Sequence, residues 1–233
     1  KETQIIAIYG KGGIGKSFTL ANLSYMMAQQ KKKVLLIGCD PKSDTTSLLF
    51  GGKACPTIIQ TSSKMKLAGD EVSIGDVCFI RDGVFAMELG GPEVGRGCGG
   101  RGIIHGFETL EKLGFHEWGF DYVLLDFLGD VVCGGFGLPI ARDMCQKVIV
   151  VASNDLQALY VANYVCYCVL PMYLKHLVLF FRAQRCEDLD FGSGAPSTIS
   201  MFWRHQFRKE SGVTVETSVC VATVGIGEDN VQP

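Results

Sequence analysis

The stretch Gly10-Lys11-Gly12-Gly13-Ile14-Gly15-Lys16-Ser17 directly follows an apolar run formed by residues 5–9. An apolar strand, a glycine-rich loop and a helix in this order match the phosphate-binding pattern G-x-x-x-x-G-K-S/T. The glycines allow backbone N–H groups to point at phosphate oxygens, and the following helix adds the positive end of its dipole. The sequence therefore predicts a phosphate-binding loop between the first strand and the first helix.

Each residue of this loop has an expected role. Lys16 is predicted to contact the β- and γ-phosphates of a bound nucleotide, and Ser17 is predicted to ligate Mg²⁺. The other nucleotide contacts are assigned to Gly10, Lys11, Gly12, Gly13, Ile14 and Gly15. Lys11 is an additional lysine one residue after the first glycine, which is typical of one branch of these nucleotidases.

The composition indicates one globular domain over residues 1–233. Hydrophobic residues make up 47% of the chain and charged residues 20%, a balance that excludes an intrinsically disordered protein. The formal net charge of −2 gives no reason to expect nucleic acid as a partner. No signal peptide is visible at the start of the sequence.

The region of residues 156–181 is apolar enough to be compared with a membrane span. Pro171, Lys175 and His176 interrupt it, and a spanning helix needs about 20 predominantly apolar residues. We therefore expect a buried helix followed by a second segment, and no membrane span.

Strand-like and helix-like segments alternate along the chain. Predicted strands cover residues 5–9, 34–38, 84–87, 122–125 and 148–151, and predicted helices cover residues 21–30, 103–113 and 156–165. Such alternation predicts an α/β P-loop NTPase fold, in which a mainly parallel sheet carries helices on both faces. Ligands of such sheets bind at the carboxyl ends of the strands, where the phosphate-binding loop and the strand-terminal acids should meet.

Aspartates follow two of the predicted strands. Asp40 and Asp44 come after the predicted strand of residues 34–38. Asp126 directly follows the predicted strand of residues 122–125, as in a Walker B element, and Asp130 comes four residues later. Phosphoryl transfer needs a held Mg²⁺ ion and a positioned water molecule. We expect Asp40 and Asp130 to orient the water, and Asp44 and Asp126 to contribute to the Mg²⁺ shell. A turn or a helix cap is the alternative role for any single aspartate.

Ten cysteines are present in the chain. A protein that uses intracellular ATP is expected in the cytoplasm, where thiols stay reduced, so most of these cysteines should be small buried hydrophobic residues. Cys39, Cys55, Cys78 and Cys145 fit this expectation.

Cys98 and Cys133 differ from the other cysteines because two glycines directly follow each of them. Glycines allow backbone N–H groups to approach a sulfur ligand, and such hydrogen bonds tune iron–sulfur clusters. A cubane cluster needs four thiolates, which two copies of the chain could supply across a two-fold axis. Zinc is a rival metal, and two buried cysteines in tight turns are the alternative without a metal.

Four segments together resemble the nitrogenase iron protein family. They are residues 10–17, 40–44, 97–102 and 128–136, of which the last, Leu-Gly-Asp-Val-Val-Cys-Gly-Gly-Phe, is the most specific. The resemblance implies a homodimer with one 4Fe-4S cluster between its subunits, and ATP binding and hydrolysis that drive electron delivery. It also implies that Cys98 and Cys133 ligate the cluster, and that Lys11 reaches the other subunit's nucleotide.

The resemblance further divides the nucleotide site into two switches. Residues 40–46 would form switch I, which includes Lys42 among its nucleotide-binding residues, and residues 126–133 would form switch II. Switch II would join a γ-phosphate sensor to a cluster ligand within eight residues, which gives a short mechanical coupling.

Within the family, residues 10–22, 93–108 and 120–151 are most similar to the X subunits of chlorophyllide a reductases. The L subunits of dark protochlorophyllide reductases come next, and nitrogenase iron proteins usually have threonine where this chain has Phe18. The resemblance implies ferredoxin as the electron donor. It also implies a two-subunit catalytic partner, of the chlorophyllide reductase Y/Z type, that reduces the chlorin C7=C8 bond in bacteriochlorophyll synthesis.

Residues 168–233 carry no convincing match to the family. The resemblance covers roughly residues 4–167, so the adenine-contacting residues are not assigned. A P-loop partitioning or cluster-carrier ATPase is the alternative from another functional class. The segment around Cys133 argues against partitioning ATPases, which lack it.

Overall fold

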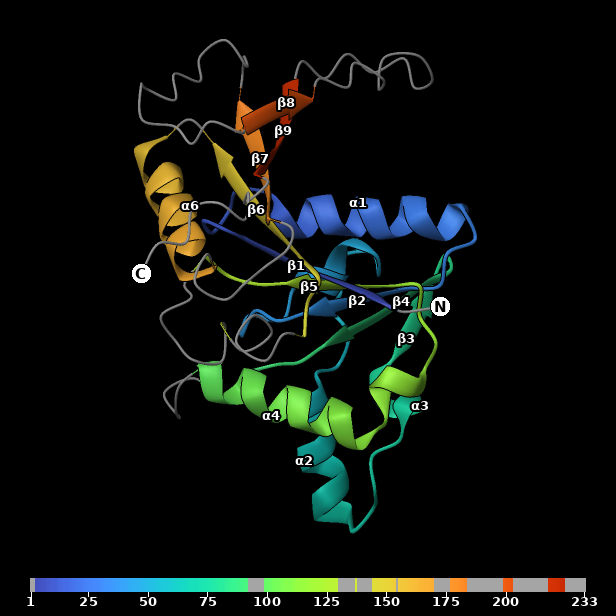
Figure 1. Ribbon diagram of the computed structural model, residues 1–233. Helices are drawn as coiled ribbons and strands as arrows, with labels where there is room; N and C mark the ends of the chain where they lie inside the picture. The colour runs from blue at the N-terminus through green and yellow to red at the C-terminus, as the bar shows by residue number, and fades with distance from the viewer. Residues whose placement is uncertain are drawn as a thin grey trace, which may run out of the picture.

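The computed structural model describes residues 3–91, 99–129, 137, 144–153, 155–169, 177–183, 199–202 and 218–224. The strands of these residues form one sheet (Figure 1). They are β1 (Gln4–Gly10), β2 (Val34–Gly38), β3 (Phe79–Arg81), β4 (Val84–Glu88), β5 (Tyr122–Asp126), β6 (Lys147–Ser153), β7 (Leu177–Ala183), β8 (Ile199–Phe202) and β9 (Ser218–Val224).

Helices connect most of the parallel strands. The α-helices are α1 (Lys16–Gln29), α2 (Ile58–Ala68), α3 (Ile74–Val77), α4 (Gly99–Lys112) and α6 (Leu156–Val169), and the 3-10 helices are η1 (Thr45–Leu48) and η2 (Phe115–Glu117). In Figure 1, α1 lies on one side of the sheet, whereas α4 and α2 lie on the other. The predicted α/β fold with helices on both faces is therefore confirmed.

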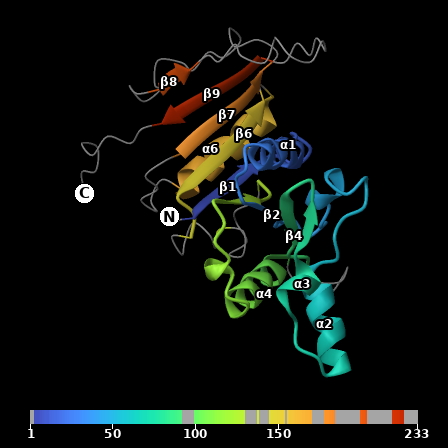
Figure 2. The same cartoon turned by 90° about the vertical axis from the view of Figure 1, so that its right-hand side faces the viewer.

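The strand order is β3-β4-β2-β5-β1-β6-β7-β9-β8. The six neighbouring strands β4, β2, β5, β1, β6 and β7 are mutually parallel. At the edges, β3 pairs antiparallel with β4, and β9 pairs antiparallel with both β7 and β8. Figure 2 shows β6, β7 and β9 following one another beside β1.

The five predicted strands lie within β1, β2, β4, β5 and β6. The prediction for the region after residue 182 was incomplete, because β7 extends to Ala183 and β8 and β9 complete one side of the sheet. The helix α2 and the short elements α3 and β3 were also missed. Their sequences are short or largely solvent-exposed, so they carry little hydrophobic periodicity.

Two helices begin before the first residue of their apolar patterns. The helix α1 begins at Lys16, at the end of the phosphate-binding loop, where the loop pattern predicts a helix and before the apolar pattern starts at residue 21. Exposed Phe18, Tyr25 and Met26 blur its amphipathic pattern. The helix α4 begins within the glycine-rich run at Gly99, where glycines suggested a loop.

The helix expected in the region of residues 156–181 is α6, and it is buried on one face only. Ala158, Ala162 and Val165 are buried, whereas Leu156 and Tyr160 are exposed. Neither α6 nor any other helix among the described residues combines the length and apolar character that a bilayer crossing requires. The second segment expected after this helix contains the strand β7.

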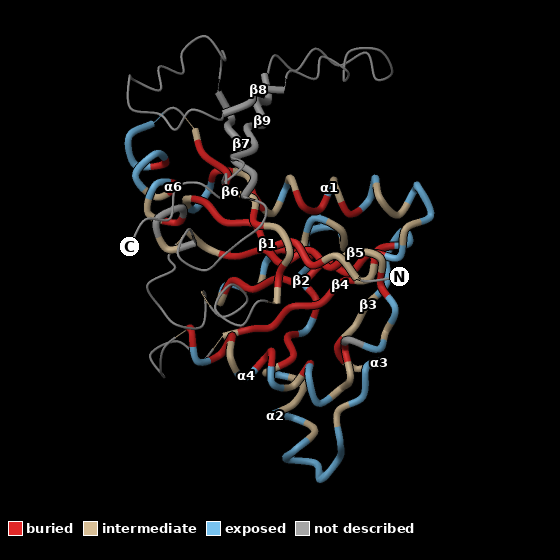
Figure 3. Tube along the Cα trace, viewed as in Figure 1, coloured by how far each residue is buried: buried red, intermediate tan, exposed pale blue. Residues whose placement is uncertain are grey.

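The core forms because successive residues of the central strands point to opposite faces of the sheet. On β1, Ile5, Ala7 and Tyr9 join the hydrophobic cluster on the α4 side, whereas Ile6 and Ile8 join the cluster on the α1 side. The central strands are buried along nearly their whole length (Figure 3). This double coverage explains why their sequences are continuously apolar.

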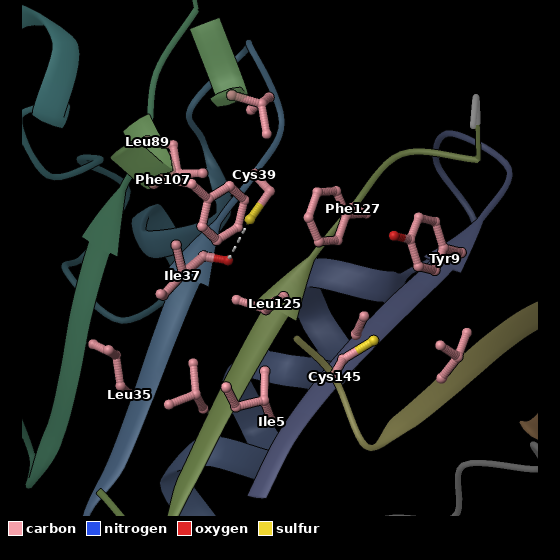
Figure 4. Packing of buried hydrophobic residues seen from close by; sticks show 14 of the residues in the cluster. Ile5, Tyr9, Leu35, Ile37, Cys39, Leu89, Phe107, Leu125, Phe127 and Cys145 are labelled. Carbon is pink, nitrogen blue, oxygen red and sulfur yellow. Dashed lines mark hydrogen bonds between the residues drawn. The ribbon is translucent and has the colours of Figure 1, made fainter. Parts of the chain in front are cut away.

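An aromatic stack closes the core near the carboxyl ends of the strands. The rings of Tyr9 and Phe127 lie 5.1 Å apart and nearly parallel, and Phe107 of α4 stacks against Phe127 (Figure 4). The thiols of Cys39 and Cys145 are buried in the same cluster. The stack fixes the chain directly after β5, where switch II is predicted to begin.

The carboxyl ends of four adjacent strands meet at one edge of the sheet. Gly38 at the end of β2 pairs in register with Glu88 of β4 and with Asp126 of β5, and Ile8 of β1 pairs with Asp126. The phosphate-binding loop starts at Gly10, the last residue of β1. This edge is where the sequence predicts the nucleotide site.

Candidate nucleotide-binding site

The loop between β1 and α1 depends on glycines with a positive φ angle. Gly10, Gly13 and Gly15 have φ angles of 152°, 76° and 100°, which residues other than glycine rarely adopt. A Cβ atom on Gly10 would lie 2.4 Å from the carbonyl oxygen of Val151, whereas one on Gly12 or Gly13 would meet nothing within 4 Å. The loop is therefore tightly packed at its base and open at its tip, as a phosphate cradle requires.

This difference makes Gly10 and Gly12 a matched pair for substitution. Gly10→Ala is expected to lower the free energy of unfolding by roughly 3 kcal/mol, because it combines backbone strain with overlap against the backbone of β6. Gly12→Ala, which adds its methyl group to open space, should change the unfolding free energy by less than about 0.5 kcal/mol. Urea denaturation of both variants measures the difference. Equal destabilisation by the two substitutions would contradict the observed loop geometry.

Lys16 is a buried cation beneath the loop. Only 7% of the residue is exposed, and its Nζ atom donates a hydrogen bond to the carbonyl oxygen of Lys11 at 3.3 Å. Burial lowers the pKa of Lys16, and the nearby charges of Asp126 and Asp40 partly oppose this shift. A buried ammonium group with one neutral acceptor is well suited to an anionic ligand such as a phosphate.

The side chain of Lys11 reaches the start of α6. Its Nζ atom lies 3.0 Å from Oδ1 of Asp155, and the same carboxylate accepts hydrogen bonds from the Ala158 N–H group and the Ser153 hydroxyl. These hydrogen bonds, that of Ser153 first, lower the pKa of Asp155 to about 2. Asp155 therefore caps α6 and holds the Lys11 side chain at the same time.

Asp126 at the end of β5 is 2% exposed. Its Oδ2 atom accepts a hydrogen bond from the Thr45 hydroxyl at 2.8 Å, whereas its buried Oδ1 atom has no hydrogen-bond partner among the described residues. Burial raises the pKa of Asp126, while the hydroxyls of Ser17 and Thr45 and the charge of Lys16 oppose this shift. An orphaned carboxylate oxygen near a serine hydroxyl fits the ligand chemistry of Mg²⁺.

The segment after β2 folds back on its own carboxylates. The Asp40 carboxylate accepts a hydrogen bond from the Lys42 N–H group at 2.9 Å, and the Lys42 ammonium lies 3.3 Å from Asp40 and 3.9 Å from Asp44. Asp40 is buried, whereas the side chains of Lys42 and Asp44 are mostly exposed. All three act electrostatically on Lys16, so the structure brings the predicted residues of this segment next to the loop.

Glu88 at the end of β4 is a third buried acid of this edge, after Asp126 and Asp40. It is fully buried, and its Oε1 atom accepts a hydrogen bond from the Thr46 N–H group at 2.7 Å. Burial raises the pKa of Glu88 to about 7, and the hydrogen bonds from Thr46 work against this shift. Glu88 was missed by the sequence reasoning, although it ends an apolar strand just as Asp126 does.

The raised pKa of Glu88 predicts a pH-dependent stability. A carboxyl group with a raised pKa favours folding below its ordinary pKa near 4.5, and this contribution is lost as the pH rises through about 7. Relative to wild type, Glu88→Gln should therefore gain up to about 3 kcal/mol of unfolding free energy between pH 5 and pH 8. Urea denaturation of both proteins at the two pH values measures this, since other titrations cancel in the difference. A difference that is independent of pH would refute the shift.

The described cysteines do not form a cluster site. Cys39, Cys55 and Cys145 are buried as expected, but Cys78 is only half-buried. Burial raises the pKa of Cys39 and Cys55, and that of Cys78 to about 11, so all three are protonated thiols. In the described part of the chain, no three His, Cys, Asp or Glu side chains are grouped to hold a metal ion.

Three predicted site residues, Cys98, Asp130 and Cys133, lie outside the described residues. The chain leading to each cysteine nevertheless leaves from the nucleotide edge. A Cβ atom on Gly91 would lie 2.8 Å from Cβ of Pro41, and one on Gly129 would lie 2.8 Å from the carbonyl oxygen of Gly10. Both segments therefore touch the predicted nucleotide-binding segments closely.

The sequence profile described as "4Fe-4S iron sulfur cluster binding proteins, NifH/frxC family" matches residues 4–179. The chain belongs to this family. The predicted resemblance is thus confirmed, and the match extends beyond the residue 167 at which the resemblance was expected to end. Members of the family bind a 4Fe-4S cluster, for which the described cysteines of this chain offer no alternative site.

Two curated relatives are chains named chlorophyllide reductase 35.5 kDa chain. The one from Cereibacter sphaeroides is 87% identical over 166 residues, and the one from Rhodobacter capsulatus is 84% identical over 166 residues. In each case the match covers 71% of this chain and 50% of the relative. The chain thus spans about half the length of these relatives.

Solved structures with a similar fold include cell division proteins and a plasmid partition protein. They include MinD from Aquifex aeolicus (TM-score 0.53, 19% identity, covering 77% of this chain and 69% of that one). MinD from Pyrococcus horikoshii, solved with Mg-ADP, gives a TM-score of 0.54 at 20% identity, with coverages of 75% and 69%. A Borrelia burgdorferi plasmid partition protein gives 0.52 at 19% identity, with coverages of 78% and 79%. At these identities the similarity shows the P-loop NTPase fold alone.

Proposed function

We propose that this chain is the ATP-binding part of a reductase component that carries a 4Fe-4S cluster and passes electrons to a catalytic partner. The main support is its 87% identity over 166 residues to a chlorophyllide reductase chain. The proposed reaction is reduction of the chlorin C7=C8 bond of chlorophyllide a, with ferredoxin as the electron donor and a two-subunit protein as the partner. The proposed location is the cytoplasm, where ATP is available and thiols stay reduced.

MgATP would supply the free energy for a conformational change, and the cluster would supply a one-electron carrier. The loop N–H groups and Lys16 hold the phosphates, and Ser17 and Asp126 hold Mg²⁺ with Asp44 nearby. Asp40 and Asp130 orient the attacking water. The buried Oδ1 atom of Asp126, which has no hydrogen-bond partner among the described residues, supports the Mg²⁺ assignment.

The proposed assembly is a homodimer in which Cys98 and Cys133 of each copy ligate one cluster. Lys11 would contact the nucleotide of the other copy, and for that it must leave Asp155, with which it is paired in the single chain. Such an exposed ion pair contributes little free energy, so replacing it by a contact between Lys11 and a phosphate group costs little free energy.

Reconstitution tests the proposed reaction. The anaerobically purified chain is combined with candidate two-subunit partners, MgATP and a reductant, and chlorophyllide a is followed by its absorption spectrum. We expect ATP-dependent reduction of chlorophyllide a. Reduction of protochlorophyllide instead would assign the chain to the L type, and activity only with a nitrogenase partner would assign it to the nitrogenase iron proteins.

A second measurement separates a reductase component from a cluster carrier. A reductase component keeps its cluster through many ATP turnovers, whereas a carrier releases the cluster to an apo-acceptor. Fewer than about one iron per dimer in protein that still binds ATP would contradict both iron–sulfur roles, because a cubane needs four irons.

A further inference from the structure

The Glu88 side chain lies buried between β4, β2 and the segment that follows β2. Its carboxyl group accepts the Thr46 N–H group at 2.7 Å, and both residues are fully buried. The Thr46 hydroxyl in turn accepts the Cys55 N–H group at 2.9 Å. Thr46 is therefore held on both sides, once through its backbone and once through its side chain.

Gly38 provides the room for this carboxyl group. It is the register partner of Glu88 in the neighbouring strand, and a Cβ atom on Gly38 would lie only 1.8 Å from Oε2 of Glu88. Any other residue at position 38 would push the carboxyl group away from Thr46. The glycine at the end of β2 and the acid at the end of β4 thus form one complementary pair.

A second acid holds the residue next to Thr46. The Thr45 hydroxyl donates to Oδ2 of Asp126 at 2.8 Å, so adjacent residues of η1 are tied to two different strands. The predicted nucleotide contacts Asp40, Lys42 and Asp44 come directly before this attachment. Their own mutual ion pairs hold them to each other and not to the sheet.

We propose that Glu88 is a positioning residue that fixes residues 40–46 at the nucleotide site by accepting the Thr46 N–H group. The role requires an acceptor oxygen at this point and does not require a negative charge. The functional meaning of this positioning rests on the proposed function, whereas the attachment itself does not.

Limited trypsin digestion of the purified full chain tests the attachment. Lys42 is 66% exposed and precedes Ser43, so cleavage after Lys42 reports how firmly residues 40–46 are held. Glu88→Ala should speed this cleavage about tenfold, because opening of the segment no longer breaks a buried hydrogen bond. Cleavage after the exposed Lys64 of α2 is the internal control and should keep its wild-type rate.

Two further variants separate positioning from a general loss of stability. Glu88→Gln keeps an acceptor oxygen and should restore the wild-type cleavage rate. Gly38→Ala keeps Glu88 but displaces its carboxyl group, and should speed cleavage after Lys42 as Glu88→Ala does. If Glu88→Ala does not fold, the comparison of Gly38→Ala with Glu88→Gln still decides the proposal.

Binding and hydrolysis of MgATP provide the functional readout. Glu88→Ala and Gly38→Ala should raise the KM for MgATP about tenfold, and Glu88→Gln should restore it. The digestion needs neither a cluster nor a partner, so failure of the proposed reductase function leaves that test intact. Unchanged Lys42 cleavage in both Glu88→Ala and Gly38→Ala, or a Glu88→Gln variant as labile as Glu88→Ala, would overturn the proposal.

Discussion

Lys16→Ala is expected to weaken MgATP binding about 100-fold or more, because truncating a buried, hydrogen-bonded charge costs several kcal/mol. Lys16 is 7% exposed, and its ammonium group donates to the loop carbonyl of Lys11. A phosphate would meet this cation in a poorly hydrated site, where the attraction is strongest. Isothermal titration calorimetry of the purified chain with MgATP measures the loss.

The control for this experiment is Lys64→Ala. Lys64 is an exposed lysine of α2, which lies away from α1 and the phosphate-binding loop (Figure 1). The control removes the same charge from the chain and should leave MgATP affinity within about twofold of wild type, as expected of a surface substitution. Equal affinities of the Lys16→Ala and wild-type proteins would exclude Lys16 as the phosphate-binding lysine.

Cys98→Ala and Cys133→Ala are each expected to lower bound iron and acid-labile sulfide at least about tenfold, because each removes two of the four thiolates of a shared cubane. The same variants should still bind MgATP, because neither cysteine is among the predicted nucleotide-binding residues. Colorimetric iron and sulfide assays on anaerobically purified protein, together with its visible absorption, measure the effect.

Cys78→Ala is the matched control for the cluster cysteines. Cys78 is half-buried, and burial raises its pKa to about 11, so it offers a thiol and no thiolate. The control should keep its full iron content. A normal cluster in either Cys98→Ala or Cys133→Ala would remove that cysteine from the proposed ligand set and would reopen the choice between a shared cluster and separate thiols.

Sequence patterns predicted the strands that form the site because their signals are local. The loop of residues 10–17 and the apolar runs before Asp40 and Asp126 each fit within a few residues, and the carboxyl-edge rule for parallel sheets then places them together. The structure brings these segments to one edge as expected.

The supporting residues could not be predicted in the same way, because their roles depend on contacts across the sheet. Glu88 and Thr46 are 42 positions apart, and Thr45 and Asp126 are 81 apart, so no local pattern connects them. The start of α4 was hidden for a different reason. Its glycines indicate a loop, yet at Gly106 the lack of a side chain allows the helix to approach Leu89, whose Cβ would lie 3.0 Å from an added methyl group.

Gly91 packs closely against Pro41, and Gly129 packs closely against Gly10. These contacts join the nucleotide edge tightly to the two chain segments that continue toward Cys98 and Cys133. A movement of either nucleotide segment toward its neighbour is expected to push against Gly91 or Gly129, because the atoms there are closely packed. The covalent chain connects these two glycines to the segments that contain Cys98 and Cys133. A methyl group at either glycine would therefore force the nucleotide segment and the cysteine-bearing segment apart at this contact.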